Sequence, residues 1–174
     1  MSFHSLGVLA ACSTALGSVL LATPAEAATR TITLQQNGTG ACQVTLPAYE
    51  SVIRRRPLAI QNEGSSGAFV SCSPASLKGI PANDTLGYTV RLVNRGASVA
   101  SVSCTGVIGS DGVTSPLPVY LIKNANVGGN SSAVLTWRSL EGYGTTVPFN
   151  FQCQLPPGVG ISGIELNQTL DVGS

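Results

Sequence analysis

The chain has 174 residues, with 9 Lys and Arg against 8 Asp and Glu, and charged residues make up only 10% of it. This length fits one domain with a substantial core. A net charge of +1 gives no field that would attract nucleic acid, which argues against a nucleic-acid-binding protein. The low charge and the 20 glycines favour strands and turns over exposed helices.

Residues 1–27 have the pattern of a secretory signal peptide. The stretch 6–21 is uncharged and rich in Ala, Leu and Val, and small residues at Ala25 and Ala27 fit the cleavage requirement of a signal peptidase. We expect cleavage after Ala27, which leaves a single β domain over residues 28–174. No later stretch approaches the length of apolar sequence that spans a bilayer, so we expect no transmembrane span in the mature chain.

An early cysteine offers a second interpretation of the same segment. Leu9-Ala10-Ala11-Cys12 has the shape of a lipoprotein box, whose cysteine would be acylated, and the start of the chain lacks the Lys or Arg usual in a signal peptide. The apolar run continues past Cys12, which favours the signal peptide. We therefore expect a secreted or periplasmic protein.

Cleavage removes His4, the only histidine, and leaves four cysteines. Thiols in an oxidising compartment pair and persist, so two disulfides are expected. The spacings of 30, 32 and 49 residues contain no C-x-x-C, which argues against a zinc site or a thioredoxin-type redox pair. Four cysteines allow three pairings. We favour Cys42 with Cys72 and Cys104 with Cys153, because each pair then joins neighbouring strand groups.

The mature chain offers little catalytic chemistry. Without histidine it has no imidazole base for a Ser-His-Asp or Cys-His arrangement and no histidine ligand for a metal. The match Gly158–Gly163 to G-x-G-x-x-G is followed by a strand pattern, whereas nucleotide binding needs a helix there. We expect no catalytic residue, metal or cofactor. The remaining acids are scattered singly beside turns and form no calcium loop: Glu50, Glu63, Asp84, Asp111, Glu141, Glu165 and Asp171.

Apolar and polar residues alternate along the mature chain. In 148–154, Phe149, Phe151 and Cys153 share one face and amides occupy the other, as in a half-buried strand. Turn residues such as Pro156-Pro157-Gly158 separate many such segments. We predict an all-β antiparallel sandwich, Greek-key or immunoglobulin-like, with Trp137 in its core. The other predicted strands are 31–34, 42–46, 58–61, 68–72, 88–94, 99–104, 119–122, 133–138 and 161–166.

Two segments share a faint internal pattern. Residues 58–72 and 90–104 each contain a strand, an Asn-x-Gly turn at Asn62 or Asn94, and a second strand that ends in Ser-Cys. Because Asn and Gly are typical turn residues of hairpins, each segment is predicted to form one hairpin.

Arg54-Arg55-Arg56 is the only charge cluster. Forked guanidinium donors suit phosphate and carboxylate groups, so the cluster predicts an anion contact for lipopolysaccharide, acidic polysaccharide or a partner's carboxylates. The alternative is an edge strand or loop that charge and Pro57 protect against strand addition.

Several short strand-and-cysteine segments of this chain resemble those of a known family. Ala41-Cys42-Gln43, Val102-Ser103-Cys104 and the ending from Phe151 to Gly158, with its Cys-x-x-Pro-x-Gly pattern, are similar to a family of small secreted four-cysteine β-sandwich proteins of Gram-negative bacteria. The resemblance spans most of residues 40–166. It implies an exported, disulfide-bonded β domain and names no ligand or reaction.

Three functions follow as hypotheses. The first is a non-enzymatic interaction or envelope-associated protein, whose partner would be an envelope polysaccharide, lipopolysaccharide or another secreted protein. The second is a pilin-like assembly subunit, because such subunits also carry an early cysteine pair, with residues 30–35 as the exchanged strand. The chain lacks their alternating apolar final strand. The third is a carboxylate-based polysaccharide hydrolase.

Overall fold

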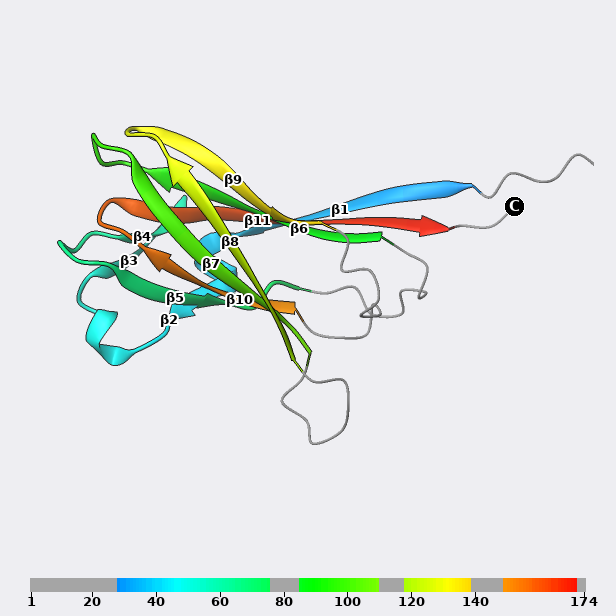
Figure 1. Ribbon diagram of the computed structural model, residues 1–174, viewed down its shortest axis with the longest axis horizontal. Coiled ribbons are helices and arrows are strands. Elements are labelled where there is room, and N and C mark those ends of the chain that lie inside the picture. The colour runs from blue at the N-terminus through cyan, green and yellow to red at the C-terminus, as the bar shows by residue number, and fades with distance from the viewer. Residues whose placement is uncertain (1–27, 76–84, 110–117, 139–148, 172–174) are drawn as a thin grey trace, which may run out of the picture.

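Figure 1 shows a computed structural model of the chain, which describes residues 28–75, 85–109, 118–138 and 149–171. The predicted signal peptide and Cys12 lie outside these residues. The described strands form two facing antiparallel sheets, which confirms the predicted all-β sandwich. The elements are β1 (Thr29–Asn37), α1 (Gly38–Ala41), β2 (Cys42–Val44), η1 (Pro47–Tyr49), β3 (Ile53–Arg56), β4 (Ala59–Asn62), β5 (Ala68–Cys72), β6 (Thr85–Asn94), β7 (Ala100–Ile108), β8 (Val119–Val127), β9 (Ser131–Trp137), β10 (Phe149–Leu155) and β11 (Val159–Asp171).

The two sheets are named sheet A and sheet B. Sheet A has the order β3-β4-β11-β6-β9, with β1 paired to β11 beyond β4, and sheet B has the order β2-β5-β10-β7-β8. The long strand β11 lies in the middle of sheet A, and β1, β11 and the first part of β6 project together from the sandwich (Figure 1). Among the described helices, none is long and apolar enough to cross a membrane.

The chain crosses between the sheets at most of its turns. β4 belongs to sheet A and β5 to sheet B, and the same holds for β6 and β7. The prediction that residues 58–72 and 90–104 each form one hairpin is therefore wrong. Each is an arch, because its two strands lie in different sheets. The asparagine of its Asn-x-Gly turn is buried instead of standing at a solvent-exposed hairpin tip.

Asn62 and Asn94 hold the two arches with the same set of hydrogen bonds. Oδ1 of Asn62 accepts from Gly64 N at 2.9 Å, and its Nδ2 donates to Ser66 O at 2.7 Å and Leu155 O at 2.8 Å. Both side chains are buried, so these bonds satisfy groups that water cannot reach. In the same way, Oδ1 of Asn94 accepts from Gly96 N at 2.9 Å, and its Nδ2 donates to Ser98 O at 2.8 Å and Val127 O at 3.0 Å.

The turn between β10 and β11 joins the two arches. Gly158 N donates to Asn62 O at 2.8 Å, and Gly158 O accepts from Arg95 N at 2.9 Å. Gly158 has φ +79°, a conformation that favours glycine, and Gly96 lies against it. One end of the sandwich is therefore a single hydrogen-bonded unit of three crossings.

The core between the sheets is aromatic at its centre. Trp137 is buried as predicted, and its Nε1 donates to Leu121 O at 2.9 Å. Phe149 stacks on Tyr88 with ring centroids 4.3 Å apart, and Trp137 contacts Phe149 and Phe151 at 5.3 and 5.5 Å. Such pairs add to the free energy of burial. The core therefore joins β6 and β9 of sheet A to β10 of sheet B.

Both predicted disulfides are present with the favoured pairing. Cys42 is bonded to Cys72 and Cys104 to Cys153. Each pair joins directly opposed residues of neighbouring strands, β2 with β5 and β7 with β10, so both disulfides lie within sheet B. All four sulfurs belong to buried residues that face the core.

We expect Asn94→Asp to lower the free energy of unfolding by about 3 kcal/mol, because two buried donors are replaced by a carboxylate that faces the carbonyls of Ser98 and Val127. Chemical denaturation with the disulfides intact measures this change. The matched control is Asn126→Asp on an exposed residue, which should change stability by less than about 0.5 kcal/mol. Equal effects at the two positions would contradict the role of the arch.

Burial raises the pKa of Tyr88 from 10.0 to about 12. Above pH 10 the unfolded chain releases this phenolic proton while the folded chain keeps it, so stability falls as pH rises from 10 toward 12. Tyr88→Phe should remove this part of the alkaline loss of stability. Tyrosinate absorbance and unfolding curves across that range measure it, and an unchanged alkaline slope in the variant would count against it.

Candidate interaction surfaces

The three predicted anion-binding arginines lie on β3, which is an edge strand of sheet A. Successive side chains of a strand point to opposite faces, so the three arginines do not share one face. Arg55 pairs with buried Ile60 and donates to Cys42 O at 3.2 Å, whereas Arg54 donates to Glu50 O at 3.2 Å. Arg54 and Arg56 therefore share a face that Arg55 does not, and the anion contact stays a prediction.

Arg56 already has an anionic partner in the chain. Its Nε and NH2 each donate to one oxygen of Glu63 at 2.8 Å. The hydrogen bonds and charge of Arg56 lower the pKa of Glu63, and Glu63 raises the pKa of Arg56. This bidentate pair lies beside a groove of about 470 Å³ lined by Arg56, Pro57, Leu58, Gln61, Glu63 and Arg95. Leu58 is 70% exposed there.

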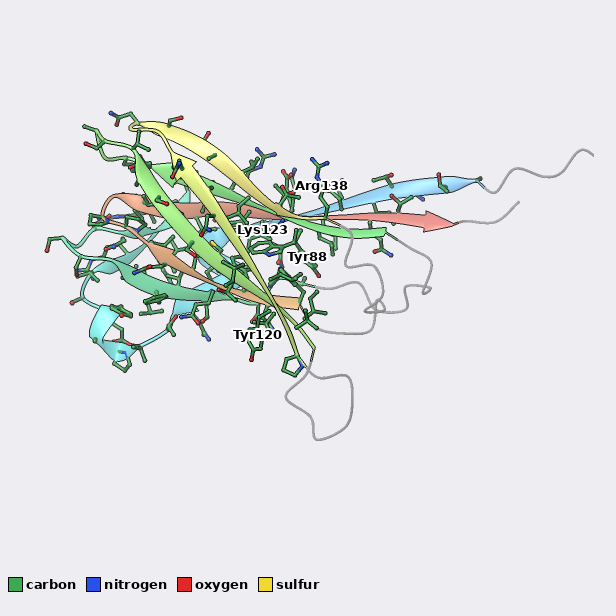
Figure 2. The ribbon with its side chains drawn as sticks, viewed as in Figure 1. Tyr88, Tyr120, Lys123 and Arg138 are labelled. Atoms are coloured by element: carbon green, nitrogen blue, oxygen red, sulfur yellow. A yellow bond between two sulfur atoms is a disulfide. The ribbon has the colours of Figure 1, made fainter. Side chains whose placement is uncertain are left out.

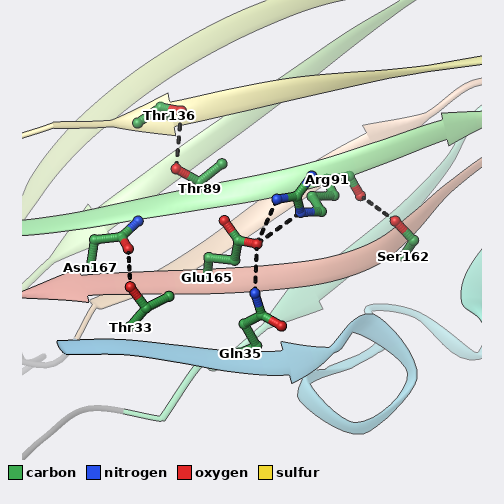
Figure 3. A network of polar contacts seen from close by, with 8 residues as sticks. All are labelled: Thr33, Gln35, Thr89, Arg91, Thr136, Ser162, Glu165 and Asn167. Carbon is green, nitrogen blue, oxygen red and sulfur yellow. Dashed lines mark hydrogen bonds and ion pairs between the residues drawn. The ribbon is translucent and has the colours of Figure 1, made fainter.

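A polar network crosses the outer face of sheet A from β1 to β6 (Figure 3). Oε1 of Glu165 accepts from Gln35 Nε2 at 3.1 Å and from Arg91 Nε and NH2 at 2.9 and 2.6 Å. Thr33 donates from Oγ1 to Asn167 Oδ1 at 2.8 Å. Three strands are thus joined by side chains, and these bonds are exposed to water, so each adds little to stability.

This network borders a polar groove of about 300 Å³. The groove opens where the register of β11 shifts between Ile161 and Gly163, and Ser162 donates to Arg91 O at 3.2 Å beside it. A bulge of this kind re-aims side chains next to it. The lining residues are Gln35, Gln36, Asn37, Arg91, Ser162, Gly163, Ile164 and Glu165.

The edges of the two sheets differ in how they are protected. β2 has only three residues, β3 carries three arginines, and β8 and β9 lie against each other after the turn that joins them. Short length, charge and cover each discourage the addition of another strand. β1 has nine residues, pairs only with β11 in the described part of the chain, and carries one charge, Arg30.

β1 contributes little to the core. Its side chains alternate between exposed and half-buried positions from Ile32 onward, and Leu34 packs at the margin of the core. The sequence identified residues 31–34 as a strand and residues 30–35 as the strand that a pilin-like subunit would exchange, but it did not mark the free edge of this strand as a binding site. The available signal was a nine-residue run with no proline and a single charge.

Two of the described carboxylates are engaged by arginines. Glu63 and Glu165 each bind an arginine, and the described residues hold no group of three metal-ligating side chains. Asp84, Asp111 and Glu141 lie outside the described residues.

No protein-family model and no curated protein matches this chain. Among solved structures, the chain is similar to the carbohydrate-binding module TmCBM61 in complex with β-1,4-galactotriose, with 10% identity and a TM-score of 0.34. The match covers 80% of this chain and 84% of the other. A TM-score this low does not establish a common fold.

The arrangement at β3 yields a test of the predicted anion contact. Because Glu63 neutralises Arg56, Glu63→Gln should strengthen binding to lipopolysaccharide if the contact exists, and Arg56→Gln should weaken it. Added salt should weaken binding by the wild type and by Glu63→Gln. If binding is unchanged by both substitutions and by salt, the anion contact is contradicted, and the three arginines serve only to protect the β3 edge.

Proposed function

We propose that this is a secreted or periplasmic, non-enzymatic interaction protein of the bacterial envelope, and that it binds a partner protein by strand addition along β1. The single observation that carries the proposal is the free edge of β1, nine residues long with one charge. Alternate backbone N–H and C=O groups of an edge strand point away from its neighbour, and a partner strand satisfies them.

The side chains of β1 can select the partner. Thr31, Thr33 and Gln35 are exposed on one face, and Ile32 and Leu34 are half-buried on the other. A strand added beside β1 would place its own side chains next to these two rows, so an alternating polar and apolar segment fits best. Backbone hydrogen bonds would give affinity, and the two rows would give specificity.

A non-enzymatic role is supported by the chemistry of the described residues. The carboxylate of Glu63 is hydrogen-bonded to Arg56, which lowers its pKa and opposes a role as a proton donor. The carboxylate of Glu165 is occupied by hydrogen bonds from Arg91 and Gln35. The two disulfides suit an oxidising compartment, which supports export.

A pilin-like assembly subunit is the second candidate, and a specific feature of β1 favours it. β1 is the first described strand and projects from the sandwich with β11 and the start of β6 (Figure 1). Besides its backbone pairing with β11, it is held there by exposed side-chain bonds (Figure 3). In the described chain β1 pairs with its own β11, so assembly would require β1 to leave and pair with β11 of another copy. That exchange preserves the same backbone bonds.

Opposed cysteines distinguish the two candidates. Thr31 lies directly opposite Thr169, away from the Glu165 network. After oxidation, Thr31→Cys/Thr169→Cys should form a disulfide within one chain if β1 stays in place, and between chains if copies exchange β1. Non-reducing electrophoresis of the exported protein separates the outcomes. A series of disulfide-linked oligomers that reductant converts to monomer would show that copies exchange β1, and would contradict strand addition by a partner.

A photo-reactive side chain tests strand addition itself. Placed at Thr33 on β1, it should form adducts with envelope proteins, and the same group at Arg54 on the protected edge β3 is the matched control. Adducts at Thr33 should persist when β1 is locked by the 31–169 disulfide. Equal adducts at both positions, or none at Thr33, would contradict the β1 edge as the binding site.

A further inference from the structure

Among the described residues, no strand residue on the outer face of sheet B is charged. Inward positions are fixed by the buried residues of β10 and β7, so the alternate residues of every strand in the sheet point outward. This face, called the amide face below, consists of Gln43, Phe69, Ser71, Ser101, Ser103, Thr105, Val107, Tyr120, Ile122, Asn124, Asn126, Asn150, Gln152 and Gln154.

The charges of the described strands are gathered elsewhere. Arg54, Arg56, Arg91 and Glu165 belong to sheet A. The strands of sheet B contain one charged residue, Lys123, and its register partner is Cys104, so it belongs to the opposite side of the sheet from Tyr120 (labelled with it in Figure 2). The two outer faces of the sandwich therefore differ in chemistry.

Six side-chain amides on this face are exposed and, within the described residues, have no hydrogen bond to the protein: Gln43, Asn124, Asn126, Asn150, Gln152 and Gln154. Each amide offers two donors and an acceptor oxygen. The register places Gln152 in one row with Ser71 and Thr105, and Gln154 in the next row with Ser103 and Asn124. Rows are about 7 Å apart and strands about 4.8 Å apart, which makes a flat grid of donors and acceptors.

We propose that the amide face binds a neutral polysaccharide. A neutral sugar chain carries hydroxyl donors and acceptors at high density, and these match free amides and hydroxyls without an ion to desolvate. An anionic chain finds no cation on this face. The inference is independent of strand addition at β1, which lies in the other sheet.

The same chemistry disfavours a protein as the occupant. The centre of a protein interface is dry and rich in aromatic residues and Arg, and buried amides there each need a matched partner. The centre of the amide face is instead Gln152 and Thr105. Its apolar groups lie toward its ends, with Tyr120 and Ile122 64% and 66% exposed on β8, and Phe69 beside Tyr49 at 6.1 Å on the other side. The exposed ring of Tyr120 suits the apolar face of a sugar, whereas Phe69 and Tyr49 are half-buried.

The test measures binding of the full mature protein to cellulose, a β-1,3-glucan and dextran, with polygalacturonate as an acidic comparison. We expect binding to a neutral polymer with a dissociation constant that changes less than about twofold with salt, since no ion pair is screened. Gln152→Ala/Gln154→Ala should weaken it about tenfold or more, because several hydrogen bonds are lost. Gln152→Glu/Gln154→Glu should weaken it as well.

The matched control adds charge to the other sheet. Ser132 is an exposed residue of β9 in sheet A, and Ser132→Glu should leave binding unchanged. Circular dichroism confirms that each variant is folded. The proposal is overturned if the wild type binds none of the neutral polymers, if only the acidic polymer binds, or if the double variant binds as tightly as the wild type. It is also overturned if sedimentation shows a dimer that the double variant abolishes, since the occupant would then be a second copy.

Discussion

The buried amides of Asn62 and Asn94 are the constraint on which the rest of the sandwich depends. Each amide closes a crossing between sheets by bonding one carbonyl of its own turn and one carbonyl of a strand in the opposite sheet. A charged or apolar side chain of the same size would leave at least one of these backbone groups unsatisfied in the core. The shared Gly158 turn then sets the two crossings at a fixed distance, which places sheet A over sheet B.

With the sheets held at this end, their outer faces and edges are free to differ. Sheet B carries both disulfides and an uncharged surface, whereas sheet A carries the arginines, Glu165 and the long free edge of β1. A rigid, cross-linked sheet suits a flat array of hydrogen-bonding groups whose spacing must be kept. A sheet whose outermost strand is fastened by exposed contacts suits association by backbone pairing. The two proposals therefore use different physical properties of the two layers.

Much of this fold could be predicted from the sequence because alternation reports which residues face the core. Phe149, Phe151 and Trp137 are buried as the pattern indicates, and the cysteine pairing follows from strand neighbours. The arches could not be predicted, because Asn-x-Gly is common to hairpins and crossings, and only tertiary burial of Asn62 and Asn94 separates the two. β3 is absent from the predicted strands because Arg54-Arg55-Arg56 has no apolar alternation, although its charges indicated an edge strand or loop. The amide face needed strand register, which brings residues from five strands into shared rows.

The register of β1 against β11 has a mechanical consequence. Thr29 is opposite Asp171, so the outer ends of both strands lie together at the tip of the ribbon. A pulling force that separates these two ends loads their hydrogen bonds one after another, as in opening a zipper, and meets low resistance at each step. A force directed along β1 loads all of its backbone bonds at once in shear. The same strand is thus easily peeled from its tip and strongly held along its length, while the disulfide-linked sheet behind it stays closed.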